Sequence, residues 1–492
     1  MKYRSVCCYV IATLITLPTT AQRATVGDGS PVATATAQRA TVGGGSPVAT
    51  PTPQRATAVP AVSTAGSIAH AWSLRECCDY AIEHSIPIKQ QENQRRQQEI
   101  QLSTSRNSRL PDVSASLNQN FSFGRGLTAD NTYSNTNTSS TSLQLGASLP
   151  LFTGFQIPNQ IKLNKLNLES ATADLEKAKN DIRMQVAQAY VQILYAMEIS
   201  DVAHRQIEID SMQVARLQAF VANGKASESE LSQQRATLAN SQLTATQADN
   251  STRLAVLTLT QLLELPTPDG FSVVRPNMDA NSSLFTLHSS LPSPDIIYAE
   301  ALGIKPEIAA QQLKLKGTEH NIKIARAGYY PTLSLSGGLG TNYYTTSGFK
   351  SDNFSTQLKN NFSQYIGLNL NIPIFNRFQT RNSIRTAKIQ RETQQLQLDN
   401  TKKTLYQEIQ KVYYNALNAL SKEQSSLEAV KSTQTAFNLM QAKYENGKAT
   451  ITEFNEAKNT YLKSESDLVQ ARYENLYQHA LLEFYRGKDL NF

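Results

Sequence analysis

Two glutamates near the end of the chain have a type and spacing that could act on ions. Glu453 and Glu456 stand three positions apart, soon after Gly447, and residues at this spacing lie on one face of a helix. Rings of acidic side chains attract cations. Acidic residues are also favoured in the first turn of a helix, where they interact with its macrodipole. The pair therefore indicates either a cation-attracting surface or a solvated helix start.

A four-residue motif that can turn the chain sharply occurs twice. Asn-Gly-Lys-Ala contains Gly224 and Lys225 at its first occurrence and Gly447 and Lys448 at its second. Glycine readily adopts the left-handed backbone conformation that ends many helices. The motif therefore predicts tight turns between antiparallel helices. A role in the turn alone and a role in function are both compatible with it.

Residue patterns that carry catalysis are missing from the sequence. It has no phosphate-binding glycine loop, no nucleophile elbow and no His-Glu-x-x-His motif. The six histidines are scattered, and Cys77 and Cys78 are adjacent rather than spaced as zinc ligands. We expect these two cysteines to pack within a helix. We also expect no catalytic residue, no metal and no cofactor, so the chain is not predicted to be an enzyme.

The charge balance does not single out a nucleic-acid partner. The formal net charge is +7 over 492 residues, and basic proteins can bind nucleic acid. However, the lysines and arginines are dispersed along the chain instead of grouped. We therefore interpret the positive charge as ordinary solvation of the surface.

Two segments, 155–222 and 377–446, predict very long helices. They contain no glycine, and Pro158 is their only proline. At 1.5 Å per residue each would be about 100 Å long, so other helices must support them from the side. Polar residues occupy most faces, as in a coiled coil with one narrow seam. The seam of the second segment has helical spacing and consists of Leu405, Ile409, Val412, Ala416, Leu420, Leu427, Val430, Phe437 and Tyr444.

Four shorter segments predict strands with one apolar and one polar face. Apolar and polar residues alternate within 113–123, 143–151, 333–342 and 365–374. This period of two is typical of a strand between lipid and a wet lumen, and about 10 residues suffice for a tilted strand to cross a bilayer. A soluble sheet packed on a helix shows the same alternation. Two polar stretches, at 124–141 and 345–363, are predicted to be the loops that join each pair of strands.

The chain also contains an internal duplication. LPLFTGFQIPNQIK at 149–162 matches IPIFNRFQTRNSIR at 372–385, and ANGKASESEL at 222–231 matches ENGKATITEF at 445–454. Both matches have the same offset of 223 residues (372 − 149 and 445 − 222). Self-similarity at a fixed offset indicates repeated structural units. The predicted organisation is a first repeat at 67–270, a linker at 271–292, a second repeat at 293–487 and a C-terminal tail at 488–492.

The N-terminal region predicts export. Residues 1–21 combine Lys2 and Arg4, an apolar stretch and a Thr-Thr-Ala cleavage site, which is the pattern of a signal peptide. Residues 22–66 are dominated by a sixteen-residue repeat rich in Ala, Thr, Gly and Pro. Such a composition cannot form an apolar core, so we predict a disordered low-complexity linker. Beyond the signal peptide no apolar run is long enough for a spanning helix.

Taken together, these features resemble the TolC family of outer-membrane efflux channels. WSLRECCDYAIEHS at 72–85 is similar to the opening helix of that family, and LTQLLELP at 259–266 is similar to the end of its first repeat. Pro111 and Pro331 stand where the family's strands begin, and LPLF and IPIF resemble its strand ends. The order of these motifs, present twice in one chain, carries the resemblance over about 67–490.

The resemblance implies a mixed α and β membrane protein in the cell outer membrane, with helices that extend into the periplasm. Four strands per chain cannot close a barrel, since about eight is the minimum, and open strand edges in lipid are costly. Strand number alone allows a dimer with eight strands or a trimer with twelve. The resemblance selects a homotrimer, with a 12-stranded β-barrel continuous with a periplasmic α-helical barrel.

The implied function is that of an outer-membrane channel component in a tripartite efflux pump or a type I secretion system. Its partners would be outer-membrane lipid, a periplasmic adaptor protein and an inner-membrane pump or ABC exporter. Drug efflux, metal efflux and protein secretion are all compatible with the sequence. The alternatives are a self-contained diffusion porin, which would not need helices of about 100 Å, and a structural coiled-coil protein, which the four amphipathic strands oppose.

The resemblance also implies roles for individual residues. The turns with Gly224, Lys225, Gly447 and Lys448 match the tips where the family docks its adaptor. Glu453 and Glu456 match two acidic positions at the channel gate, where three chains would form an acidic ring. Tyr444 and Glu230 match positions that link neighbouring helices and hold the entrance shut. The family's best-described gate also has an arginine two residues after the tip glycine. Here that residue is Ala449, so we expect a closing network that is weaker or differently made.

Overall fold

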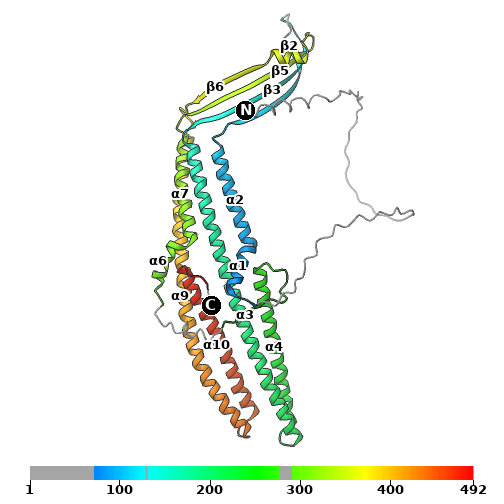
Figure 1. The fold of residues 1–492 in the computed structure, drawn as a ribbon, viewed down its shortest axis with the longest axis vertical. Coiled ribbons are helices and arrows are strands. Elements are labelled where there is room, and N and C mark those ends of the chain that lie inside the picture. Colours follow the sequence, from blue (N-terminus) through cyan, green and yellow to red (C-terminus); the bar gives the residue numbers. More distant parts are fainter. Residues whose placement is uncertain (1–70, 128–130, 277–290, 491–492) are drawn as a thin grey trace, which may run out of the picture. The chain divides into compact units, whose positions relative to one another are not determined.

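The computed structural model describes residues 71–127, 131–276 and 291–490, which lie within one compact unit, Gly66–Phe492. The predicted signal peptide at 1–21 and linker at 22–66 lie outside the described residues. The elements follow one another as helices, a strand pair and a helical hairpin, and then in the same order again (Figure 1).

Two pairs of long helices dominate the structure. α3 (Gln156–Ala222) and α9 (Gln379–Glu445) have 67 residues each, and α4 (Glu228–Leu262) and α10 (Ile451–Tyr485) have 35 each. The longer pair would span about 100 Å at 1.5 Å per residue. α3 packs with α4 and α9 packs with α10 as two antiparallel hairpins (Figure 1). The long helices predicted from the sequence are therefore confirmed to within two residues.

Shorter helices pack beside the halves of α3 and α9 that lie nearer the sheet (Figure 1). α1 (Leu74–His84) and α2 (Ile86–Asn107) pack on α3, α6 (Pro294–Ile304) packs on α9, and α7 (Pro306–Ala327) packs on both. Most of the buried apolar residues gather here in one cluster. Within the described part of the chain, no helix has the length and apolar character needed to cross a bilayer.

Cys77 and Cys78 lie in this cluster, buried and unbonded to each other, as expected for packing residues. Burial raises the pKa of each thiol to about 12, so both stay protonated at neutral pH. Near them, β1 (Ala71–Trp72) pairs in parallel with β4 (Ser272–Val273). The predicted linker at 271–292 thus begins with a short strand that is tied to the start of the described chain.

The four remaining strands form one antiparallel sheet. Its order is β2 (Asp112–Leu127), β3 (Tyr133–Thr153), β5 (Thr332–Thr346) and β6 (Ser363–Asn371). Directly paired residues share a face of an antiparallel sheet. The register pairs apolar residues across the strands, such as Leu149 with Leu335 and Leu335 with Leu368. The apolar residues that this register pairs therefore share one face of the sheet.

The predicted loop at 124–141 is wrong. β2 continues to Leu127 and β3 begins at Tyr133, so the two strands have 16 and 21 residues instead of about 10. Polar side chains hydrogen-bond across these strands: Gln119 donates to Ser139 over 2.9 Å and accepts from Thr141. Cross-strand polar pairs stabilise a sheet as apolar pairs do. A polar composition is therefore compatible with a strand as well as with a loop, and the prediction of a loop from composition alone fails here.

The second half of the sheet differs in two further respects. The predicted loop at 345–363 contains a short helix, α8 (Phe354–Asn360), which is capped by the side chain of Asn353. In addition, β6 ends at Asn371, whereas the predicted fourth strand continued to 374. Ile374 lies beyond the strand with 96% of its surface exposed.

Each long helix follows its strand through two consecutive left-handed residues. Gly154 and Phe155 have φ of +62° and +66°, and Arg377 and Phe378 have φ of +53° and +61°. At Gly154 a Cβ atom would lie 2.8 Å from the carbonyl oxygen of Ala327, so only glycine fits. The chain enters both long helices by the same strained turn, which sets the direction of each helix relative to the sheet.

Candidate functional site

The two helical hairpins end in turns of the same construction. Lys225 N donates to Phe220 O over 2.8 Å and Gly224 N donates to Val221 O over 2.9 Å. The corresponding bonds at the other turn are Lys448 N to Lys443 O, 2.8 Å, and Gly447 N to Tyr444 O, 3.0 Å. This is the Schellman pattern, which requires a left-handed residue after the helix. Gly224 and Gly447 supply it, with φ of +68° and +69°.

The tips are exposed and open around the two glycines. No atom lies within 4 Å of a Cβ added at either one, and both lysines that follow are exposed. The tips therefore present accessible backbone and two ammonium groups to any partner.

The helices that leave the turns begin with matching capping boxes. Ser227 accepts from Glu230 N while Glu230 accepts from Ser227 N, and Thr450 and Glu453 exchange the same pair of bonds. Glu230 and Glu453 are equivalent at the offset of 223 (453 − 230). Of the three glutamates indicated by the sequence, Glu230 and Glu453 thus cap a helix, which satisfies otherwise unpaired N–H groups.

Glu453 and Glu456 lie together on one groove between α9 and α10. The groove has a volume of about 260 Å³ and is completed by Thr433, Ala436, Met440, Ala457 and Thr460. Bonds from Thr450, first from its backbone N–H and then from its hydroxyl, hold the pKa of Glu453 below its usual range. Both carboxylates are exposed. The structure therefore brings the acidic pair to one surface.

Tyr444 links the hairpins through a residue that the sequence did not indicate. Its ring stacks on Phe454 at 5.1 Å and lies 5.5 Å from the guanidinium of Arg216 on α3. Arg216 also donates to Glu445 O over 3.2 Å. Among the described residues no hydrogen bond joins the Tyr444 hydroxyl to Glu230, whose carboxylate caps α4. Arg216 belongs to none of the motifs that the sequence repeats, so the sequence gives no signal for its role.

A buried ion pair lies further from the tips, in the seam between α3 and α10. Lys458 on α10 contacts Asp210 on α3, and both side chains are fully buried. Asp210 also accepts from Ser241 over 2.5 Å and from Gln234 over 3.2 Å, and Gln234 accepts from Asn455 over 3.0 Å. This polar network joins three helices from both hairpins.

An apolar cluster fills the seam between the ion pair and the tips. Its buried members come from α3, α4, α9 and α10 and are Val214, Leu217, Leu231, Phe437, Ile451 and Phe454. The seam therefore combines apolar contacts near the tips with a buried charge pair above them, and any movement of one hairpin against the other must disturb both.

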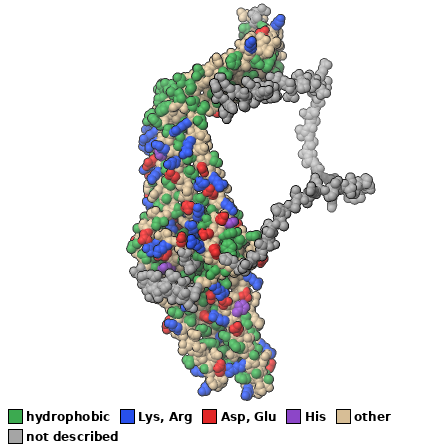
Figure 2. Space-filling model, viewed as in Figure 1, with side chains coloured by type: hydrophobic (Ala, Val, Ile, Leu, Met, Phe, Trp, Pro, Cys, Tyr) green, Lys and Arg blue, Asp and Glu red, His purple; other side chains and the backbone are tan. Residues whose placement is uncertain are grey.

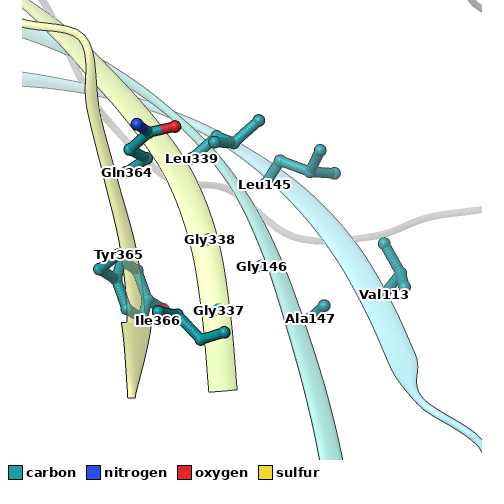
Figure 3. A pocket seen from close by; sticks show the side chains of 10 residues that line it. All are labelled: Val113, Leu145, Gly146, Ala147, Gly337, Gly338, Leu339, Gln364, Tyr365 and Ile366. Carbon is teal, nitrogen blue, oxygen red and sulfur yellow. The ribbon is translucent and has the colours of Figure 1, made fainter. Parts of the chain in front are cut away.

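The sheet carries an apolar surface of a different kind. Large side chains on its apolar face are exposed, among them Val113, Leu117, Ile366, Leu368 and Leu370. A depression of about 450 Å³ lies on the sheet, and on the apolar face Gly337 stands between Ala147 and Ile366 without a side chain (Figure 3). An exposed apolar surface on this scale marks contact with a membrane or another protein.

Charges are distributed differently over the helices. On the face shown in Figure 2, positive and negative side chains alternate along the helices without a patch of one sign. Within the described residues no group of three or more His, Cys, Asp or Glu side chains is arranged to hold a metal ion.

The sequence matches the family model described as outer membrane efflux protein over residues 78–264 and 297–487. It is 27% identical to the cobalt-zinc-cadmium resistance protein CzcC of Cupriavidus metallidurans, over 63% of this chain and 69% of CzcC. It is 22% identical to the outer membrane efflux protein BepC of Brucella suis, over 80% of each chain.

The fold is that of solved outer-membrane channels. VceC of Vibrio cholerae superposes with a TM-score of 0.68 at 18% identity, over 85% of this chain and 97% of VceC. CmeC of Campylobacter jejuni superposes with a TM-score of 0.66 at 19% identity, over 85% of this chain and 87% of CmeC. At these identities the superpositions show a shared mixed α and β fold that is mostly helical.

Proposed function

The chain belongs to the outer membrane efflux protein family, and we propose that it is the passive outer-membrane conduit of a tripartite efflux pump or a type I secretion system. It lies in the cell outer membrane, with its long helices in the periplasm. Passing a solute through a pore requires a lining and a gate but no bond chemistry, so the proposed role is transport and not catalysis.

The sheet is the observation that carries the proposal. Its four strands expose an apolar face, and the edge strands β2 and β6 each pair with one neighbour among the described strands. Unpaired edges in hydrocarbon would cost several kcal/mol per backbone group. If β2 of one copy pairs with β6 of the next, three copies close a 12-stranded barrel. We therefore propose a homotrimer, with the apolar face against outer-membrane lipid and the polar face lining the pore.

The long helices give the second part of the proposal. Six hairpins from three copies would continue the barrel as an α-helical tunnel, with the turns at its periplasmic end. The exposed tips with Gly224, Lys225, Gly447 and Lys448 are the proposed docking points for a periplasmic adaptor, which would connect an inner-membrane pump or ABC exporter. A self-contained porin would have no use for helices of about 100 Å.

The gate is proposed to lie near the second tip. Three copies of Glu453 and Glu456 would form an acidic ring that attracts cations. Tyr444 is the proposed link that holds the hairpins together, through Arg216 and Phe454. Glu230 would contribute by fixing the start of α4 instead of by bonding Tyr444.

The trimeric channel is tested by purifying the full chain in detergent and measuring its native mass and its conductance in planar bilayers. We expect a stable trimer that forms cation-selective pores. A monomer or dimer as the stable species, or a trimer without conductance under any voltage or salt condition, would contradict the proposal.

A further inference from the structure

A pocket away from the tips and the sheet has no part in the function proposed above. It lies between α3, α9, α10 and the junction of α6 with α7, and its volume is about 310 Å³. Small-ligand pockets begin at about 300 Å³. Its charged lining consists of Lys177 and Asp181 on α3, Lys305 and Glu307 at the junction, and Glu408 on α9.

Lys305 is the unusual member of this lining. Only 6% of its surface is exposed, and its Nζ atom lies 4.3 Å and 4.4 Å from the ring centroids of Phe484 and Tyr485. An ammonium group has three donors, yet within the described residues Lys305 makes no side-chain hydrogen bond and no ion pair. Lys305 borders the pocket, and its Nζ atom is not among the fully enclosed polar atoms without a partner, so the ammonium can donate to a ligand that enters there.

The carboxylates of the pocket are only partly engaged. Asp181 is paired with Lys177 at 2.5 Å, whereas Glu307 and Glu408 form no ion pair within the described part of the chain. Glu408 only accepts a long bond, 3.4 Å, from the Tyr485 hydroxyl. All three carboxylates act electrostatically on Lys305. The pocket thus has positive and negative side chains in its lining, and Glu307 and Glu408 interact with Lys177 and Lys305 only electrostatically, without direct ion pairs within the described residues.

We propose that this pocket binds a small zwitterion, such as a free amino acid or the end of a short peptide. Its carboxylate would accept from Lys305, and its ammonium group would lie against Glu307 and Glu408. A simple anion would be attracted by Lys305 but repelled by the two glutamates, and a simple cation would be attracted by the glutamates but repelled by Lys305. A zwitterion satisfies both sets of groups without adding net charge. A ligand held there would also bridge the α6–α7 junction to α9.

Binding is tested on the purified full-length trimer in detergent, by saturation-transfer NMR and calorimetry. The probes are glycine, L-alanine and L-alanyl-L-alanine as zwitterions, with acetate and methylamine as the separate charges at the same concentrations. We expect at least one zwitterion to bind and neither acetate nor methylamine to compete with it. Absence of binding by every zwitterion, or equal binding by acetate, would overturn the proposal.

Variants locate the site. Lys305→Met keeps an apolar stem against the two rings and should weaken zwitterion binding by at least about tenfold, about 1.4 kcal/mol. Glu408→Gln can still accept from Tyr485 and should also weaken binding, which keeps the test valid if the first variant fails to fold. Lys314→Met, which removes a half-exposed lysine paired with Asp174 outside the pocket, should have no effect. Unchanged binding in a folded Lys305→Met or Glu408→Gln variant would refute the assignment.

Discussion

Asp210 and Lys458 show how a single buried pair can join two halves of a chain. Lys458→Met would leave Asp210 charged and unpaired in the seam, which costs about 3–5 kcal/mol. The double variant Asp210→Asn, Lys458→Met removes both charges, keeps an acceptor oxygen for Gln234 and offers an amide N–H that can donate to the Ser241 hydroxyl oxygen, so it should lose much less. Unfolding followed by helical circular dichroism measures both. Lys463→Met, an exposed position on α10, is the control and should change stability by no more than about 0.5 kcal/mol.

The acidic pair makes a second prediction at this scale. Changing both Glu453 and Glu456 to Ala should reduce cation selectivity and block by multivalent cations in planar bilayers, because the ring would lose its charge. The trimer should assemble as before. Glu428→Ala, an exposed glutamate elsewhere on α9, serves as the control. If selectivity and block persist in the double variant, the pair is only a helix start.

The capping bonds of Glu453 predict how its charge responds to pH. Bonds from Thr450 lower the pKa of Glu453, so this contribution to stability is present above the ordinary glutamate pKa and is lost as pH falls through the lowered value. Thr450→Ala removes the hydroxyl bond and should raise the pKa. Cation selectivity titrated with acid should then disappear at a higher pH than in the wild type. An unchanged midpoint would mean that Glu456 or other groups carry the selectivity.

Residue identity alone predicted only part of this site. The sequence indicated the glycines through the repeated turn motif, and the glutamates through their spacing and the family resemblance. Asp210 and Lys458 were missed, although each interrupts an apolar stripe: Asp210 precedes the buried Val214 by one turn, and Lys458 follows the buried Phe454 by one turn. The partner of a charged residue in the seam lies on another helix, so the sequence alone does not identify it. The contact between Arg216 and Tyr444 is likewise known only once the helices are packed together.

At the scale of elements, the turns can be tested without disturbing the packing. Gly447→Val, and likewise Gly224→Val, places a β-branched residue at positive φ, at a cost of about 1–2 kcal/mol. A Cβ atom added at either glycine would meet no atom within 4 Å apart from its neighbours in the chain. The destabilisation therefore comes from the backbone conformation and stays local to the tip. We expect transport to be lost while the trimer remains in the outer membrane, as measured by efflux or secretion assays and by membrane fractionation.

Two further variants separate the turn from docking. Gly447→Asn tolerates the left-handed conformation and should keep transport. Lys225→Glu with Lys448→Glu keeps both turns and reverses the charge of the tips, so it should impair transport if an adaptor docks there. Normal transport by the charge-reversed variant would show that the lysines take no part in docking.

The elements themselves were largely predictable, and the exceptions have a physical cause. Long helices follow from an unbroken helical period without glycine, and tip turns follow from Asn-Gly. The strand from Tyr133 was assigned too short because Ser, Thr and Asn are as common in loops as in strands. Only the partner strand, through bonds such as Gln119 to Ser139, shows that this polar stretch is ordered in a sheet.

At the scale of the whole molecule, the closed barrel is the main prediction. A cysteine in β2 and another in β6 of the same chain should crosslink between copies and yield a covalent trimer on denaturing gels, since β2 of one copy would pair with β6 of the next. Cysteines placed in the inner strands β3 and β5 should crosslink within one chain only. Crosslinks from β2 to β2 would indicate a two-fold arrangement and contradict the trimer.

The unpaired edges of the sheet have a consequence for how such a protein is made. The helical hairpins bury their own seam within a single chain, but in the proposed trimer β2 and β6 would gain their second neighbours only when copies meet. Before assembly, each newly made chain would expose two unpaired strand edges and the apolar face of the sheet, which promote incorrect pairing with other newly made chains. Assembly of the proposed trimer would therefore compete with aggregation. Slow synthesis would keep the concentration of partner chains low and delay assembly, whereas overproduction without chaperones would favour aggregation.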